Sequence, residues 1–229
     1  MLDLHTHILP QMDDGSKSMA ESLEMLALEK KHGVGRVALT PHFYAHRETL
    51  ESFLERRGEA EQALRRHMAE GGEYPQVFVG AEVAFFNGMS RNEDIEECCL
   101  EGSQAMLIEM PFCKWTRPMW DELQYLRDVR GIQPVLAHVE RYLRFQPMGT
   151  VNTLCENGYF IQANGNFFLR WKTRPLAMHL LKKGKIHFLG SDCHSIAHRP
   201  PNLNAAVAEI EKKLGREAIA ALKAMAERI

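Results

Sequence analysis

Hydrophobic residues recur along the chain with two periods, which alternate from the amino terminus onward. Short apolar or alternating runs predict strands at residues 2–7, 34–40, 76–82, 105–109, 133–138, 159–164 and 186–191. Apolar residues spaced three or four apart predict helices at residues 18–33, 49–70, 91–100, 118–129, 149–157 and 173–183, and from 200 onward. Gly215 is expected to divide the last segment into two helices.

Local signals support several of these boundaries. Ser18 and Glu21 have the spacing of a capping box at a helix start. Pro118 suits the first turn of a helix, where its missing N–H costs nothing, and Gly184 suits a helix end.

Strands that alternate with helices indicate parallel strands joined by helical crossovers. Seven such units fit one closed or nearly closed barrel better than two domains, and a doubly wound open sheet is the alternative. No linker, low-complexity run or repeat divides the chain. We therefore predict a single α/β domain over residues 1–229.

Composition excludes several classes of protein. The chain is 45% hydrophobic and 25% charged, as is usual for a globular domain, and its net charge of −2 argues against a nucleic-acid surface. It has no apolar stretch long enough to span a membrane and no basic, then apolar, leader. These features predict a cytoplasmic protein. The five cysteines include no CxxC pair, so a metal site here would use nitrogen and oxygen donors.

Histidine or carboxylate residues follow six of the seven predicted strands. In chain order they are His5, His7, His42, Glu82, Glu109, His138, Asp192 and His194, while the sixth strand ends on Asn164. Each alone could be a surface acid or a core histidine, but the carboxyl ends of barrel strands share one rim, where active sites are built. Asp14 in the first loop raises the number of candidate ligands to nine, which predicts two or three metal ions.

The donor types and charges favour phosphate chemistry. Mixed histidine and carboxylate donors suit Mn, Fe, Co or Zn better than Mg or Ca. The four carboxylates would leave a positive excess beside three divalent ions, which favours a phosphate dianion, but neutrality beside two. Arg141 and Arg199 lie close to candidate ligands and could hold phosphate oxygens bidentately; the alternative is that both are solvated surface residues.

Together these stretches resemble the PHP (polymerase and histidinol phosphatase) superfamily. More narrowly, they resemble its bacterial metal-dependent protein-tyrosine phosphatases of capsule and exopolysaccharide synthesis. The matching stretches are residues 3–10, 13–15, 40–42, 80–83, 138–142, 191–194 and 199–201. The HxH pair is common among metal hydrolases, whereas the DDG and HxERY stretches are more specific to this group.

The resemblance implies a distorted seven-stranded TIM-like barrel of PHP type with a trinuclear centre, often containing manganese. It places all nine candidate ligands in the metal set and Arg141 and Arg199 on the phosphate. It implies hydrolysis of phosphotyrosine by metal-activated water without a phosphoenzyme. The partner it implies is a bacterial tyrosine kinase that controls polysaccharide export. Residues 195–198 and the bulky segment 167–170 depart from the family pattern near the substrate.

Three other functions compete with this interpretation. Cys193 and Arg199 have the C-x5-R spacing of cysteine-dependent tyrosine phosphatases, but the loop between them has no glycine and two prolines follow it. A PHP enzyme acting on a small ester such as histidinol phosphate would use the same metals. A metal-stabilised binding module would have the fold without turnover.

Overall fold

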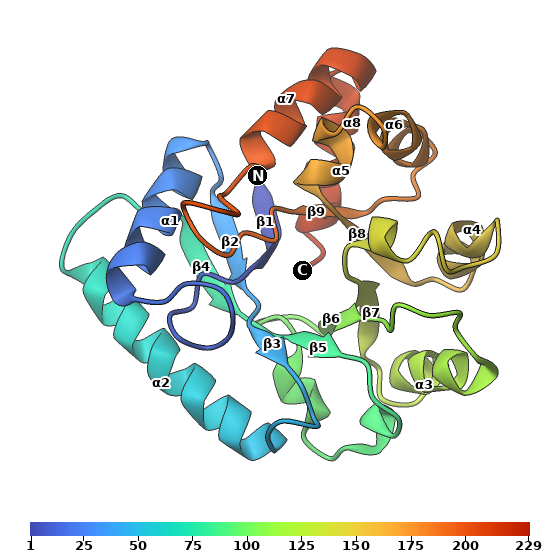
Figure 1. The fold of residues 1–229 in the computed structure, drawn as a ribbon, viewed down its shortest axis with the longest axis horizontal. Helices are drawn as coiled ribbons and strands as arrows, with labels where there is room; N and C mark the ends of the chain where they lie inside the picture. Colours follow the sequence, from blue (N-terminus) through green and yellow to red (C-terminus); the bar gives the residue numbers. More distant parts are fainter.

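The computed structural model describes residues 1–229 as a central group of parallel strands with helices around it (Figure 1). The strands are β1 (Leu2–Thr6), β2 (Arg36–Leu39), β3 (His42–Phe43), β4 (Gln76–Val79), β5 (Glu82–Ala84), β6 (Ala105–Glu109), β7 (Gln133–Leu136), β8 (Phe160–Asn164) and β9 (Phe188–Gly190). Their residues are mostly buried, as expected where helices cover a parallel sheet.

Eight α-helices and three short 3₁₀ turns connect the strands. The helices are α1 (Met19–Lys31), α2 (Leu50–Ala69), α3 (Arg117–Asp128), α4 (Thr150–Glu156), α5 (Gly165–Leu169), α6 (Arg174–Lys182), α7 (Leu203–Leu214) and α8 (Arg216–Ala226). The 3₁₀ turns are η1 (Met89–Arg91), η2 (Ile95–Cys98) and η3 (Val139–Arg141). The helix expected at residues 91–100 is therefore wrong, since η1 and η2 flank a short non-helical segment, and α5 was not expected.

The strands pair in two parallel sheets, with orders β1-β2-β4 and β3-β5-β6-β7-β8-β9. The sheets divide at two places. One lies between β2 and β3, just after the strand expected at residues 34–40, and the other lies between β4 and β5, inside the strand expected at residues 76–82. Pro41 at the first break has no N–H to donate to a neighbouring strand, which limits pairing there. The backbone pairing thus confirms an α/β fold with parallel strands, arranged as a three-stranded and a six-stranded sheet; the distorted seven-stranded barrel stays a prediction.

The first and last strands lie side by side although they are far apart in the sequence. The N–H of Asp192 donates to the carbonyl of His5 (2.8 Å), and the N–H of His7 donates to the carbonyl of Cys193 (2.9 Å). Contacts between β1 and β9 therefore bring the ends of the two sheets together.

A β-bulge in β1 separates an apolar layer from a polar one. The register with β2 shifts between Asp3 and Thr6, so that Leu4 and His5 together face the single residue Ala38. Leu2 and Leu4 belong to a buried apolar cluster of eleven residues inside the sheet. Asp3 lies on the outer face of β1, where it contacts Glu29 of α1. Because of the bulge, His5 does not share this face but points toward the centre, where it lies beside Glu82.

No helix of the structure is both long enough and apolar enough to cross a membrane.

Candidate metal centre

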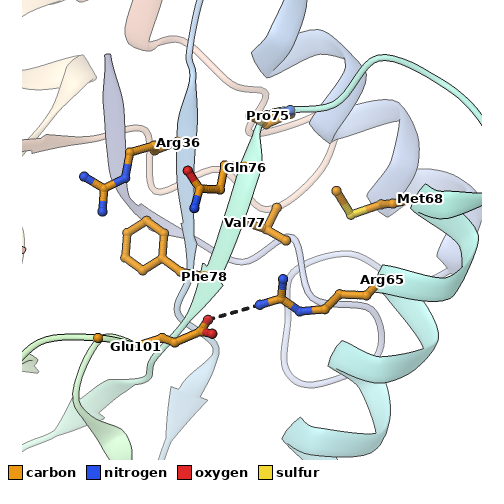
Figure 2. Close-up of a pocket in the computed structure, with 9 residues that line it drawn as sticks. Arg36, Arg65, Met68, Pro75, Gln76, Val77, Phe78 and Glu101 are labelled. Carbon is orange, nitrogen blue, oxygen red and sulfur yellow. Dashed lines mark hydrogen bonds and ion pairs between the residues drawn. The ribbon is translucent and has the colours of Figure 1, made fainter.

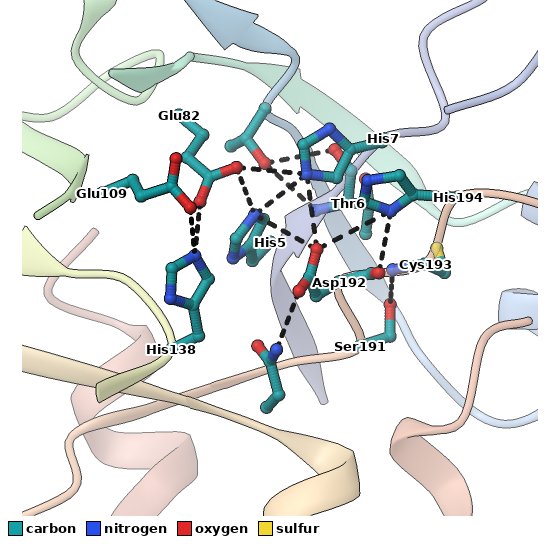
Figure 3. A network of polar contacts seen from close by, with 12 residues as sticks. His5, Thr6, His7, Glu82, Glu109, His138, Ser191, Asp192, Cys193 and His194 are labelled. Atoms are coloured by element: carbon teal, nitrogen blue, oxygen red, sulfur yellow. Dashed lines mark hydrogen bonds and ion pairs between the residues drawn. The ribbon is translucent and has the colours of Figure 1, made fainter. Parts of the chain in front are cut away.

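The nine predicted ligands converge at the carboxyl end of the strands, and Figure 3 labels all of them except Asp14 and His42. They lie within or just after β1, β6, β7 and β9, at the first residues of β3 and β5, and in the loop that follows β1. Glu82 and His42 thus begin short strands, whereas the sequence suggested that they follow longer ones. All nine stand close enough to one another to form three overlapping groups.

The first group surrounds the side chains of His5 and His7. Their Nε2 atoms are 3.1 Å apart, and Oε2 of Glu82 lies 3.1 Å from the first and 3.3 Å from the second. Oδ1 of Asp192 lies 3.7 Å and 3.4 Å from the same two nitrogens. Two ligands about 2.1 Å from one tetrahedral ion would be ~3.4 Å apart, so these spacings suit a shared cation.

The second group includes Glu82, Glu109 and His138. The Nε2 of His138 lies 2.8 Å from Oε1 of Glu82 and 3.3 Å from Oε1 of Glu109. Ligand atoms of His42, Glu82 and Glu109 also lie within 4.8 Å of one another. Glu82 therefore uses both carboxylate oxygens, one toward each group, as a ligand that bridges two ions would.

The third group lies on the open side of the centre. Oδ1 of Asp14 lies 3.8 Å from Nε2 of His42 and 3.5 Å from Nε2 of His194, and His7 completes the set. The Asp14 side chain is 72% exposed, whereas those of His42 and His194 are only 10% and 8% exposed. An ion held here would be the one most accessible from solvent.

Unpartnered buried atoms support the fit of metal ions to these groups. Oε2 of Glu82 is buried and forms no hydrogen bond, although nitrogens of His5, His7 and His42 lie within 3.3 Å of it. Such an atom is costly to bury unless a cation balances it.

The histidines and carboxylates of the centre shift one another's pKa values. Burial lowers the pKa of His7, but hydrogen bonds to Asp13, Asp192 and Glu82 raise it well above its usual value. Burial likewise opposes ionisation of Glu82, yet attraction to His5 and His42 lowers its pKa well below the usual range. The arrangement of these side chains thus favours positive charge at the centre of the site.

Two ligands occupy backbone conformations that ordinary residues rarely adopt. His138 has φ of 32° and Asp192 has φ of 54°, both in the left-handed region. Each such residue costs on the order of 1 kcal/mol or more and is typical of functional sites. The turn away from the strand direction points both side chains into the centre.

Asp13 orients the ligands beside it, a role that the sequence reasoning missed. Its Oδ2 accepts hydrogen bonds from Nδ1 of His7 (2.7 Å) and from the backbone N–H of His42 (2.8 Å), while Oδ1 accepts from the N–H of Gly15 (2.8 Å). Donation from Nδ1 leaves Nε2 of His7 free to face the centre. The acidic pair at residues 13–14 could have indicated this division between a supporting carboxylate and a ligand.

Strand β8 supplies supporting amides and no ligand. Oε1 of Gln162 lies 3.3 Å from Nδ1 of His5 and accepts the backbone N–H of His138 (2.6 Å). The amide nitrogen of Gln162 donates to Asn164, which in turn donates to Oδ2 of Asp192 (2.8 Å). Gln162 also escaped the sequence reasoning, because an isolated glutamine in a strand carries no metal-binding signal.

Both predicted arginines lie beside the centre. The guanidinium groups of Arg141 and Arg199 each contact Oδ2 of Asp192, and a nitrogen of Arg199 lies 3.1 Å from Nε2 of His194. They line one cavity of about 390 Å³ together with Asn164 and Ser191. Their side chains are 35% and 34% exposed, so each can reach a molecule in that cavity.

Cys193 is unsuited to nucleophilic attack. Its side chain is completely buried, and burial together with nearby Asp3 and Glu29 raises the pKa of its thiol well above the usual value. The thiol is therefore protonated and inaccessible, which argues against the cysteine mechanism.

A larger cavity, of about 520 Å³, lies at the opposite end of the strands (Figure 2). It is lined by residues near the starts of β2 and β4, including Arg36 and Gln76, and by the ion pair of Arg65 with Glu101 (3.0 Å). It contains no histidine and no second carboxylate, so it offers no comparable metal site.

Known proteins resemble the chain over nearly its whole length. The tyrosine-protein phosphatases CpsB of Streptococcus agalactiae and YwqE of Bacillus subtilis are 27% and 28% identical to it, each over 95% of this chain and over 92% and 86% of their own lengths. A crystal structure from work on YwqE and on CpsB of Streptococcus pneumoniae, described as unique metal-dependent tyrosine phosphatases, matches with a TM-score of 0.82 and 25% identity. That match covers 97% of this chain and 94% of the other.

A more distant match concerns the fold alone. The phosphotriesterase homology protein of Escherichia coli superposes with a TM-score of 0.60 at 10% identity. The family model described as capsular polysaccharide synthesis, CpsB/CapC, matches residues 1–227. With that match, and with the predicted ligands gathered at one end of the sheet, the chain belongs to the CpsB/CapC family.

Proposed function

We propose that this protein is a metal-dependent tyrosine-protein phosphatase. The observation that carries the proposal is the convergence of three histidine–carboxylate groups around Glu82, with Arg141 and Arg199 at their edge. The names of the relatives CpsB and YwqE support the same activity.

We propose two or three divalent ions, with manganese first and iron, cobalt or zinc as alternatives. His5, His7, Glu82 and Asp192 would hold one ion; Glu82, Glu109 and His138 a second; and Asp14, His42 and His194 a third. Bound ions would lower the pKa of a water molecule and neutralise the phosphate charge. The protein's own part is to fix the ligands through Asp13, Gln162 and Asn164.

Arg141 and Arg199 are suited to binding the phosphate oxygens that face away from the metals. Their shared contact with Asp192 holds both guanidinium groups beside the ligand set before substrate arrives. A guanidinium presents paired N–H donors that match two phosphate oxygens and neutralise charge that develops during transfer.

The aromatic ring of the substrate has a candidate surface in Phe112. This side chain is 46% exposed, packs near the ring of His138 (6.3 Å between centroids), and lines a cavity of about 400 Å³ with Arg141. The leaving phenolate has a pKa near 10, so departure needs little help from an acid.

The wider setting is also part of the proposal. We infer a single domain over residues 1–229 in which the two sheets act as one distorted seven-stranded barrel, since β1 and β9 are in contact. We propose that the partner is a phosphotyrosine-bearing tyrosine kinase of capsule or exopolysaccharide synthesis, met in the cytoplasm.

The test compares a phosphotyrosine peptide with histidinol phosphate, each with Mn²⁺ and after chelation. We expect peptide hydrolysis that is lost with the chelator and restored by Mn²⁺. Activity that survives complete metal removal would refute a metal mechanism. Metal-dependent hydrolysis of histidinol phosphate alone would move the function to small esters.

A further inference from the structure

Two further arginines lie beside Arg141, and the proposed reaction does not use them. The cavity of about 390 Å³ that holds Arg141 and Arg199 adjoins the one of about 400 Å³ that holds Phe112. The two cavities share a wall made of Glu140, Arg141, Arg170 and Thr173, and Arg144 lines the second. Together they form one hollow that extends from the metal centre across the loops after β7 and β8.

The backbone of Arg170 is fixed in position, although its side chain is exposed. Its N–H donates to the carbonyl of Asn166 (3.1 Å), and its own carbonyl accepts the N–H groups of Thr173 (3.1 Å) and Arg174 (2.9 Å). The side chains of Phe167 and Phe168 anchor this segment, being only 3% and 0% exposed. The bulky residues that depart from the family pattern thus support an arginine beside the active site.

Charge in this hollow is unbalanced. The guanidinium groups of Arg144 and Arg170 form no ion pair, whereas Arg174, four residues further on, pairs with Glu209 at 2.8 Å. Glu140 is the one carboxylate that lines the two cavities, and it accepts the backbone N–H of Asn164 (3.3 Å). Arg141 and Arg199 contact Asp192, so Arg144 and Arg170 are the two guanidinium groups of the hollow without a carboxylate partner, which favours an anion that comes from outside the chain.

We propose that Arg144 and Arg170 form a second anion subsite, which binds an acidic group on a residue that flanks the phosphotyrosine. This inference rests on the proposed function, since Arg141 links the subsite to the phosphate site. A peptide advances about 3.3 Å per residue when extended, so a residue one to three positions away can reach an adjoining cavity. The acidic group can be a carboxylate or a second phosphate, because both accept hydrogen bonds from a guanidinium.

The test uses three groups of metal-loaded assays on phosphotyrosine peptides of one sequence. The peptides of the first group have only neutral residues beside the phosphotyrosine. Those of the second group have one glutamate there, and those of the third group have a second phosphotyrosine. The acidic residue is placed in turn at each position up to three residues from the phosphotyrosine. We expect kcat/KM to be about fivefold to twentyfold higher for at least one acidic peptide than for the neutral one, and to fall toward it as salt rises.

The variants Arg170→Ala and Arg144→Ala should reduce that preference to about twofold or less. Lys172→Ala is the matched control, because it removes the same charge two residues from Arg170 but Lys172 lines neither cavity. It should leave the preference unchanged.

The outcomes separate this inference from the proposed function. Hydrolysis of all peptides at equal rates, or a preference that persists in both arginine variants, refutes the subsite while the phosphatase stands. If histidinol phosphate is hydrolysed with metal and no peptide is hydrolysed at all, both the subsite and the proposed tyrosine phosphatase are refuted. A preference for phosphate alone or for glutamate alone identifies the natural flanking group.

Discussion

Replacing Asp13 with asparagine tests whether a residue outside the ligand set controls metal binding. The carboxylate accepts three hydrogen bonds, from Nδ1 of His7 and from the backbone N–H groups of His42 and Gly15. Asparagine has one acceptor oxygen. If that oxygen accepts the hydrogen bonds from His7 and His42, the amide NH₂ group lies against the backbone N–H of Gly15. Two donors then face each other, and no hydrogen bond forms between them.

The expected cost follows from these contacts. One buried backbone donor loses its partner, at about 1–3 kcal/mol, and the bond from His7 changes from charge-assisted to neutral, at about 1 kcal/mol. We therefore expect the free energy of unfolding of the metal-free variant to fall by about 2 kcal/mol or somewhat more. Because Asp13 orients His7, a candidate ligand of the first ion, we expect Mn²⁺ affinity to fall by about 10–100-fold.

Calorimetric titration of metal-free protein with Mn²⁺ measures the affinity, and urea unfolding measures the stability. Activity of Asp13→Asn should recover as Mn²⁺ is raised, because all nine ligands are still present. Asp121→Asn is the control, since Asp121 forms only an exposed pair with Arg117, worth less than about 1 kcal/mol. Wild-type Mn²⁺ affinity in a folded Asp13→Asn variant would refute the proposed role of Asp13.

Three further predictions concern glycine packing, a buried acid and the cysteine. A Cβ on Gly190 would lie 2.6 Å from Cβ of His5, so Gly190→Ala should lower the free energy of unfolding, measured in urea, by about 2 kcal/mol or more. The control is Gly58→Ala in α2, where the added Cβ meets open space and should raise the free energy of unfolding by about 0.5–1 kcal/mol. Equal effects of the two substitutions would refute the packing argument. Burial and nearby Asp3 raise the pKa of Glu29 from 4.5 to about 10, so the folded state keeps a proton that the unfolded state releases. The free energy of unfolding should therefore fall as pH rises from about 4.5 to about 10, by up to ~1.4 kcal/mol per pH unit. Urea titrations at several pH values should show that Glu29→Gln flattens this slope. An unchanged slope in the variant would show that Glu29 is ionised in the folded protein. The kcat of Cys193→Ser on a phosphotyrosine peptide should stay within about threefold of the wild-type value, because a buried, protonated thiol is not a nucleophile. Complete loss of turnover in a folded variant would instead support the cysteine mechanism.

The sequence predicted which side chains gather at one end of the sheet, because parallel strands place their carboxyl ends together. His5, His138 and Asp192 could be assigned to one end of a sheet from strand positions alone, without knowledge of the pairing. The capping box was half right. Ser18 accepts the N–H of Glu21, but the Glu21 carboxylate accepts the N–H of Lys17 and not that of Ser18.

The remaining features depend on contacts between distant segments. The bulge at Leu4 and His5 arises from the register between β1 and β2, and a simple alternation would leave Asp3 and His5 on one face. The same holds for Gln162, whose role exists only because β8 passes behind His5 and His138. Local sequence carries no record of such neighbours, so the gathering of the candidate ligands was predictable and the residues that support them were not.

The contact between β1 and β9 sets an order of events during synthesis. Asp192 and His194 leave the ribosome more than 180 positions after His5 and His7. Because a non-local contact forms only after the loop between its partners has closed, the histidine pair spends most of translation without Asp192. The group around His5 and His7 is thus incomplete until the last strand docks, although Glu82 can join the pair earlier. The complete set of candidate ligands is consequently a property of the finished fold and of no early segment of it.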